Sequence, residues 1–152
     1  GRVERLAAEA LAELRAAIFE LRPADLAGDG LAASLRKHVR LLDRLHPSLV
    51  SFECAELPPL DPAVEVAVLR VAQEALHNAL RHSGAGRVRV RLAYEDGKLA
   101  LTVRDDGGGF EPAGSRGLGL VSMRDRAESV GGVMTVESAR GQGTTVRVEV
   151  GV

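Results

Sequence analysis

Three polar side chains, Glu74, Asn78 and Arg81, could act together on a charged ligand because they share one side of a predicted helix. The run from Val64 to His82 contains no Gly or Pro and has apolar residues at helical spacing, which indicates one helix. At about 100° per residue, the three polar positions fall within an arc of about 60°. The opposite side suits a core, since its residues are Val68, Ala72, Ala75, Leu76 and Ala79.

This polar face could bind a phosphate group or a metal ion. The side-chain oxygen of Asn78 is a hard, neutral ligand suited to Mg²⁺, which keeps several waters and binds few protein oxygens. Glu74 could accept a proton or hold a metal-bound water, and Arg81 and His82 could meet phosphate charge. A solvated helix face is the alternative, and the helix alone does not decide between the two.

Three glycine-containing stretches follow this helix in the chain. Asp105 to Phe110 reads Asp-Asp-Gly-Gly-Gly-Phe, in which the glycines let the backbone approach a flat ligand. A buried Asp105 could accept a hydrogen bond from an exocyclic amine such as that of adenine, whereas an acidic turn would not need three glycines. Gly114 to Leu120 runs into a predicted helix, whose first N–H groups can bind an anion, although it matches no Walker A or Rossmann motif. Gly141 to Thr145 is a tight turn that enters the last predicted strand.

Length and composition restrict the class of protein. The 152 residues suit one domain, and the 3% of aromatic residues predict a core of Leu, Val and Ala. A net charge of −1 gives no indication of nucleic-acid binding, and the single Cys54 excludes an internal disulfide. No apolar run approaches the ~20 residues of a membrane span, and no signal peptide is present. We therefore expect a cytoplasmic domain without membrane contact.

The hydrophobic pattern predicts an α+β two-layer sandwich, in which helices cover one face of an antiparallel sheet. Asp61 is expected to cap the helix that contains Asn78, with Pro62 as its first residue. Residues 24–30 are expected to form a loop. Helices are predicted at 3–21, 30–45, 64–82 and 118–130, and strands at 49–54, 87–94, 99–105, 133–138 and 144–150.

Two further groups of side chains have both a chemical and a structural interpretation. His38 and His46 lie at no metal-like spacing from Cys, Asp or Glu, so both are expected on the surface. Arg87, Arg89 and Arg91 alternate with apolar residues and point to one face of a strand. They could bind a phosphate backbone, but a solvated face of an antiparallel sheet is the favoured interpretation.

Taken in order, the chemical motifs read Glu-x-x-x-Asn, Asp-x-Gly-x-Gly, Gly-Leu-Gly-Leu and Gly-x-Gly-Thr. This succession resembles the N, G1, G2 and G3 boxes of the GHKL, or Bergerat-fold, ATP-binding superfamily, over roughly residues 49–152. Within it, the chain is most similar to sensor histidine kinases of the NarX/DesK-like type. That similarity rests on Gln73 to Ser83, Gly119 to Ala127 and Ile18 to Pro23, and on a short lid between Phe110 and Gly117. It implies a mixed, mostly antiparallel sheet covered by helices on one face.

The resemblance implies a role for each matching residue. Asn78 would hold Mg²⁺ against the triphosphate, and Glu74 matches the acid that serves as general base in some superfamily ATPases. Asp105 would bind the adenine amine, with Gly107 and Gly109 permitting the fit. The other positions expected beside the nucleotide are Arg81, His82, Gly117, Leu118, Gly119, Leu120 and, behind the adenine, Thr144.

The resemblance also implies domains and partners. Residues 1–23 would be the second helix of a dimerisation hairpin and 24–152 the catalytic domain that binds ATP and Mg²⁺. No His precedes His38, so the phosphoacceptor His would lie outside this chain, on a parent kinase that forms a homodimer and passes phosphate to a response regulator. The first residues read as the middle of a helix, so the chain is expected to be a fragment.

Two alternatives and one departure from the family pattern remain at this point. A stand-alone anti-sigma-type serine kinase of the same superfamily is the first alternative. A degenerate domain that binds a partner without catalysis is the second, although the intact Glu74, Asn78 and Asp105 argue against it. Relatives often have Asn at the position of Asp106, which predicts altered contacts on the side of the lid.

Overall fold

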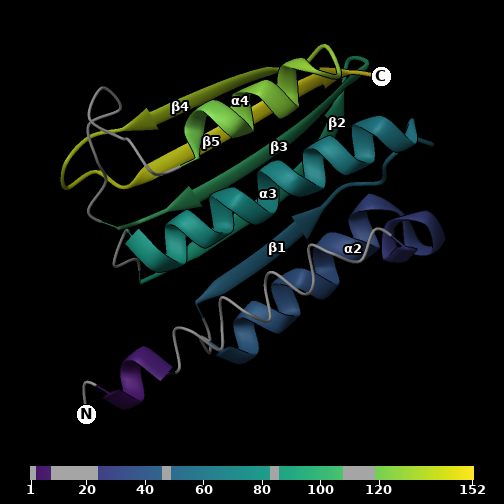
Figure 1. Ribbon diagram of the computed structural model, residues 1–152. Helices are drawn as coiled ribbons and strands as arrows, with labels where there is room; N and C mark the ends of the chain where they lie inside the picture. The colour runs from purple at the N-terminus through teal and green to yellow at the C-terminus, as the bar shows by residue number, and fades with distance from the viewer. Residues whose placement is uncertain (1–2, 8–23, 46–48, 83–85, 108–118) are drawn as a thin grey trace.

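A computed structural model describes residues 3–7, 24–45, 49–82, 86–107 and 119–152 (Figure 1). Its helices and strands follow the predicted order closely. A short helix covers residues 3–7, and the remaining elements are α2 (Ala24–Leu45), β1 (Val50–Cys54), α3 (Pro62–His82), β2 (Val88–Glu95), β3 (Lys98–Asp105), α4 (Leu120–Glu128), β4 (Val133–Ser138) and β5 (Thr144–Gly151).

The strands form one five-stranded sheet in the order β1-β2-β3-β5-β4. β1 pairs with β2 in parallel, whereas the other three pairings are antiparallel. Helices α2, α3 and α4 lie on the same face of this sheet (Figure 1). The predicted mixed two-layer sandwich is therefore confirmed, and its core lies between the helices and the inward-facing Val and Leu residues of the strands.

Helix α3 begins where its sequence predicts. Asp61 precedes it, and its Oδ1 accepts the Ala63 N–H at 2.9 Å, while Pro62 is the first helical residue and needs no N–H partner. The predicted apolar side is buried in full: Val68, Ala72, Ala75, Leu76 and Ala79 are each at most 3% exposed. This burial holds the polar side of the helix in a fixed orientation.

The predicted loop at residues 24–30 is wrong, because this stretch is helical and belongs to α2. Only Gly30 leaves the helical conformation, with φ 80° and ψ 174°, which an L side chain rarely adopts. The helix restarts at Leu31, whose N–H donates to Glu65 Oε2 of α3 at 2.7 Å. The Glu65 carboxylate of α3 thus caps the part of α2 that begins at Leu31. Because of this cap, the helix is interrupted only at Gly30 and not over the whole predicted loop.

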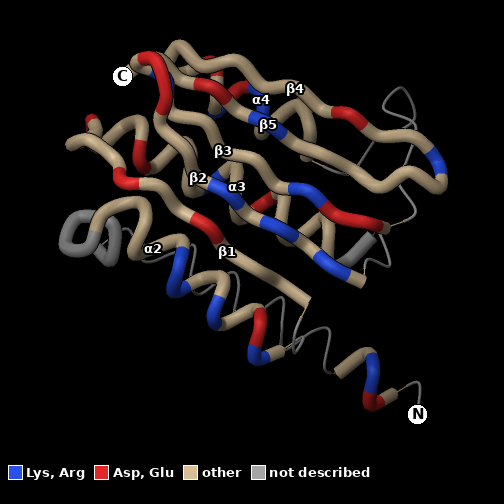
Figure 2. Tube along the Cα trace, turned by 180° about the vertical axis from the view of Figure 1, so that it is seen from behind, with Lys and Arg blue, Asp and Glu red and all other residues tan. Residues whose placement is uncertain are grey.

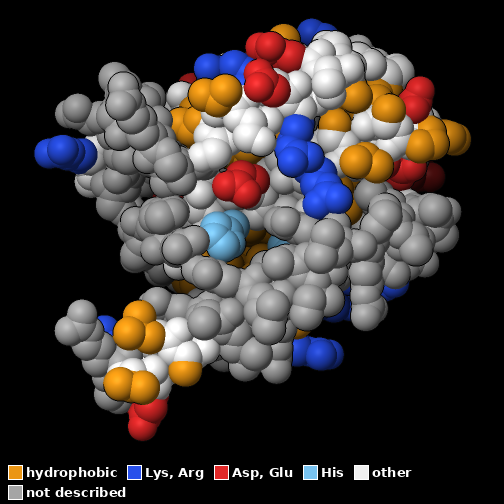
Figure 3. All heavy atoms as spheres, in the orientation of Figure 1, with side chains coloured by type: hydrophobic (Ala, Val, Ile, Leu, Met, Phe, Trp, Pro, Cys, Tyr) orange, Lys and Arg blue, Asp and Glu red, His pale blue; other side chains and the backbone are white. Residues whose placement is uncertain are grey.

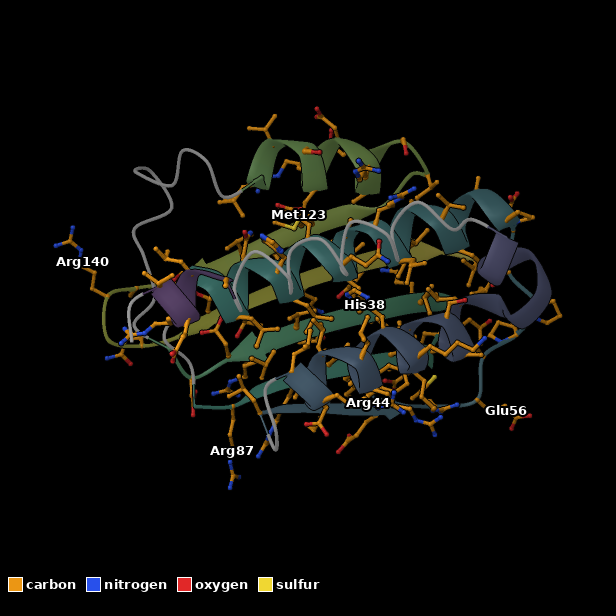
Figure 4. All side chains as sticks on the ribbon, turned by 60° about the horizontal axis from the view of Figure 1, so that its bottom comes forward. His38, Arg44, Glu56, Arg87, Met123 and Arg140 are labelled. Atoms are coloured by element: carbon orange, nitrogen blue, oxygen red, sulfur yellow. The ribbon has the colours of Figure 1, made fainter. Side chains whose placement is uncertain are left out.

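The prediction of a surface position for His38 is also wrong. His38 is only 2% exposed and lies between α2 and α3 (Figure 4), while His46 lies outside the described residues. Burial lowers the pKa of its imidazole from 6.5 to about 4, and the nearby His77 adds to this effect. His38 is therefore a neutral core residue at neutral pH.

Folding stability should decrease in acid because of His38. Its pKa is lower in the folded chain than in the unfolded chain, so the unfolded state binds more protons as the pH falls. The stability that neutral His38 contributes is complete above pH 6.5 and is lost towards pH 4, by up to about 3 kcal/mol. Urea unfolding of the wild type and of His38→Leu across this range tests it. Parallel pH profiles for the two proteins would contradict the assignment.

Many Lys, Arg, Asp and Glu residues lie along the strands, which Figure 2 shows from the side opposite to Figure 1. Arg89 and Arg91 point outward from β2 and are exposed, and Arg89 lies opposite Arg104 of β3. On β5, Arg147 forms an ion pair with Glu149 at 2.8 Å. Exposed charged residues on this outward side of the strands are expected for a solvated sheet.

The structure describes only the first part of the predicted N-terminal helix. Residues 3–7 are helical, whereas the rest of the stretch predicted at 3–21 lies outside the described residues. Val3 and Leu6 are 80% and 56% exposed. Among the helices that the structure describes, none is long and apolar enough to cross a membrane.

Candidate functional site

The elements that carry the predicted site residues meet at one end of the fold. In Figure 1 the ends of α3 and β3 lie at the same edge as the starts of α4 and β5. The strand pairing explains part of this arrangement, because Asp105, the last residue of β3, pairs with both Val88 of β2 and Thr144 of β5. Polar residues that are far apart in sequence therefore converge at this edge.

Asp105 is the buried carboxylate that the sequence led us to expect. It is 6% exposed, and its Oδ1 accepts the N–H of Gly107 at 2.9 Å. Burial raises the pKa of the Asp105 carboxyl, whereas backbone hydrogen bonds from Gly107 and Thr144 oppose this rise. These two donors satisfy part of the carboxylate, which can still accept further hydrogen bonds from a ligand.

Thr144 lies beside Asp105 and belongs to a small hydroxyl network. Its Oγ1 lies 2.8 Å from Oγ of Ser138, and the Ser138 hydroxyl donates to the Gly143 carbonyl oxygen at 3.2 Å. Gly143 has φ 74°, and a Cβ there would collide with the carbonyl oxygen of Asp105. Only glycine lets the turn before β5 pack this closely against the end of β3.

Glu74 and Asn78 lie one turn apart on α3, and both are half-buried. Across from them, Gly119 directly precedes α4 and has φ 68°. A Cβ at Gly119 would lie 2.5 Å from Oε1 of Glu74. The backbone at the start of α4 therefore lies directly against the Glu74 carboxylate, and a larger residue would both strain the turn and displace that carboxylate.

The structure describes the remaining predicted positions to different degrees. Leu120 is the first residue of α4 and is half-buried. Arg81 and His82 end helix α3, but their side chains are outside the described part. Gly109, Gly117 and Leu118 lie outside the described residues altogether.

Two polar residues near the site were not predicted. Gln73 of α3 is 2% exposed, and neither its amide nitrogen nor its oxygen has a hydrogen-bond partner among the described residues. His77 is half-buried on the same helix and close enough to His38 to affect its pKa. The sequence signal for Gln73 and His77 was only their position at the border of the apolar side of α3. Figure 3 shows a histidine and an acidic side chain next to each other on this face of the molecule.

The donor set does not resemble a site at which the protein alone holds a metal ion. No group of three or more His, Cys, Asp or Glu suited to a metal occurs within residues 3–7, 24–45, 49–82, 86–107 and 119–152. Asn78 and Glu74 offer one amide oxygen and one carboxylate on the same helix face. This set fits a Mg²⁺ ion that takes most of its ligands from water and substrate phosphates.

The chain resembles known proteins in sequence. A model of the family described as histidine kinase-, DNA gyrase B-, and HSP90-like ATPase matches residues 63–152. The chain is 37% identical over 150 residues to the sensor histidine kinase LiaS of Bacillus subtilis, and 33% identical over 154 residues to the oxygen sensor histidine kinase NreB of Staphylococcus carnosus. These matches cover 97% and 98% of this chain but only 41% and 44% of the relatives.

Solved structures share the fold at lower sequence identity. The histidine kinase domain of the blue-light activated histidine kinase EL346 of Erythrobacter litoralis matches with a TM-score of 0.74 and 21% identity, covering 94% of this chain and 74% of that one. Acinetobacter baumannii histidine kinase AdeS matches with a TM-score of 0.64 and 18% identity, covering 88% and 76%. Because the family match spans more than half of the chain and includes α4 and β2 to β5, the chain belongs to the histidine kinase-, DNA gyrase B-, and HSP90-like ATPase family.

Proposed function

We propose that this chain is the ATP-binding catalytic domain of a two-component sensor histidine kinase. In the parent protein it would transfer the γ-phosphate of ATP to a histidine outside this chain, for relay to a response regulator. The observation that carries the proposal is the buried Asp105 carboxylate, which lies between Gly107 and Thr144 within the family match.

Asp105 would recognise the adenine. Its carboxylate would accept a hydrogen bond from the exocyclic amine of the base while keeping its bonds to the Gly107 and Thr144 N–H groups. Gly107 and Gly109 would let the base approach the backbone, and Thr144 would lie behind it. Such a carboxylate rejects a base with a carbonyl at the same position, because two acceptors would face each other.

The triphosphate would lie towards α3 and the start of α4. Asn78 would hold Mg²⁺ through its side-chain oxygen, and the ion would neutralise phosphate charge when bound. Glu74, placed against Gly119, would act as general base or hold a water near the reacting phosphate. The backbone at Gly117 to Leu120, with Arg81 and His82, would bind the phosphates.

The phosphoacceptor would be supplied from outside this chain. His38 is buried in the core and cannot reach a nucleotide without local unfolding. The chain spans less than half of the length of the curated relatives that it matches, which leaves room in a parent protein for an acceptor helix. The exposed Val3 and Leu6 support a helix at the N-terminal end that packs in a homodimer of the parent. Nothing in the comparisons favours the serine-kinase alternative.

Incubation with γ-labelled ATP and Mg²⁺ tests whether the phosphoacceptor histidine lies outside this chain. The chain alone should acquire no stable label above that of a heat-denatured sample. A parent kinase that contains the upstream helices should acquire acid-labile label on histidine. Stable phosphohistidine on this chain alone would contradict the proposed location of the acceptor, and stable phosphoserine on a partner protein would favour the serine-kinase alternative.

A further inference from the structure

The Asp106 side chain joins two segments that border the candidate site. Its Oδ1 accepts the backbone N–H groups of Gly86 and Arg87, each at 2.8 Å. The backbone N–H of Asp106 in turn donates to the Arg87 carbonyl oxygen at 3.2 Å. The residue is exposed, yet it makes three hydrogen bonds to the segment that follows α3 and enters β2.

The backbone at Asp106 is also held from the opposite side. A Cβ at Gly143, in the turn before β5, would lie 3.3 Å from the Asp106 Cα and would collide with the Asp105 carbonyl oxygen. The end of β3 therefore lies between the start of β2 on one side and the turn before β5 on the other. Gly143 supplies close packing, whereas Asp106 supplies three directional bonds to the start of β2.

The two neighbouring carboxylates have opposite environments. Hydrogen bonds from the Arg87 and Gly86 backbone lower the pKa of Asp106, so it is ionised at neutral pH. Burial raises the pKa of Asp105, and the negative charge of Asp106 adds to that rise. The Asp106 carboxylate thus faces the β2 segment, whereas the Asp105 carboxylate is buried.

We propose that Asp106 is a positioning residue of the nucleotide site, which holds the turn from Asp105 to Gly107 in the orientation that selects adenine. The inference rests on the proposed function of Asp105 and adds a residue that touches no substrate. Without the bonds from the Gly86 and Arg87 N–H groups to the Asp106 carboxylate, the turn from Asp105 to Gly107 could move relative to β2. The bond between Asp105 and the base amine depends on that position, because hydrogen bonds weaken steeply with misalignment.

The test compares Asp106→Ala with Asp106→Asn. Alanine removes the acceptor, whereas asparagine keeps an oxygen that can bond to the Gly86 and Arg87 N–H groups. Glu56→Ala is the matched control, since Glu56 is an exposed acid that points to solvent away from Arg87 (Figure 4). Each protein is titrated with ATP and with GTP in the presence of Mg²⁺, and amide hydrogen exchange is followed at Gly86 and Arg87.

Asp106→Ala should weaken ATP binding about tenfold and reduce the preference for ATP over GTP by a similar factor. Exchange at the Gly86 and Arg87 amides should become faster in the same variant. Asp106→Asn and Glu56→Ala should keep the wild-type preference within about threefold. A general loss of structure would weaken ATP and GTP equally, so the ratio separates positioning from stability.

Two results would overturn the inference. One is an unchanged ATP preference in a folded Asp106→Ala protein whose Gly86 and Arg87 amides exchange faster. The other is a tenfold loss of the preference for ATP over GTP in Asp106→Asn, while the Gly86 and Arg87 amides stay protected from exchange. This second result applies even if the alanine variant does not fold. Failure of the wild type to bind ATP would instead reject the proposed function itself.

Discussion

Asp105→Asn should weaken ATP binding about 100-fold, because the variant has one acceptor oxygen where three N–H donors converge. Those donors are the backbone N–H groups of Gly107 and Thr144 and the proposed base amine. In asparagine, the NH₂ group must face at least one of them, so one donor loses its partner in a buried position. Fluorescence or calorimetric titration with ATP would measure the loss.

The control for this substitution makes the same chemical change at the other end of the sheet. Asp96 is exposed in the β2–β3 hairpin with φ 53°, a conformation that asparagine tolerates well. Asp96→Asn should therefore bind ATP as the wild type does. Wild-type affinity in a folded Asp105→Asn protein would show that the adenine does not lie at Asp105.

Asn78→Ala should lose at least about tenfold in Mg²⁺-dependent ATP affinity while the domain stays folded. Asn78 is half-buried on the side of α3 opposite the core, so truncation of its side chain opens no core cavity. The loss should appear when Mg²⁺ is present and should be small when the ion is chelated. Titration with and without a chelator measures both values.

Gln142→Ala is a matched control for Asn78, because it removes an exposed side-chain amide from the turn before β5. It should preserve both the affinity and its dependence on Mg²⁺. Circular dichroism of both variants should show wild-type helix content. An Asn78→Ala protein with unchanged Mg²⁺ dependence would mean that the metal binds elsewhere.

Local patterns predicted those parts of the fold that local physics determines. The 3.6-residue period of α3 predicted which side is buried, and Asp61 with Pro62 predicted where the helix begins. The Asp-Gly pair at positions 96–97 predicted the hairpin, whose two residues have φ 53° and 76°. These features depend on neighbours within a few residues, so the sequence was sufficient.

Features that depend on distant residues could not be read from local patterns. The short break at Gly30 is stabilised by Glu65, which lies 34 positions after Leu31, the residue whose N–H it accepts. No residue close to Gly30 in the sequence predicts that bond. The burial of His38 is different, because His38 lies three residues after Leu35 and four before Leu42, on the buried face of α2. Its helical spacing was therefore a local signal, which the expectation of a surface position did not use. The bonds of Asp106 to Gly86 and Arg87 exist only because β2 and β3 pair in one register.

The candidate site shows the same division. The resemblance to the ATP-binding superfamily pointed to Glu74 and Gly119 separately, from two motifs. The structure adds that the Gly119 backbone lies against the Glu74 carboxylate, which accounts for glycine at that position. Ser138, which links Thr144 to the Gly143 carbonyl, had no motif to identify it and emerged only from the pairing of β4 with β5.

Calorimetric titration of the wild-type chain with a non-hydrolysable ATP analogue, with and without Mg²⁺, tests the central claim most directly. We expect saturable binding of one nucleotide per chain, stronger with Mg²⁺ than without it, and greatly weakened in Asp105→Asn. No binding of the analogue under either condition would contradict the account and would favour a domain that binds a partner without catalysis.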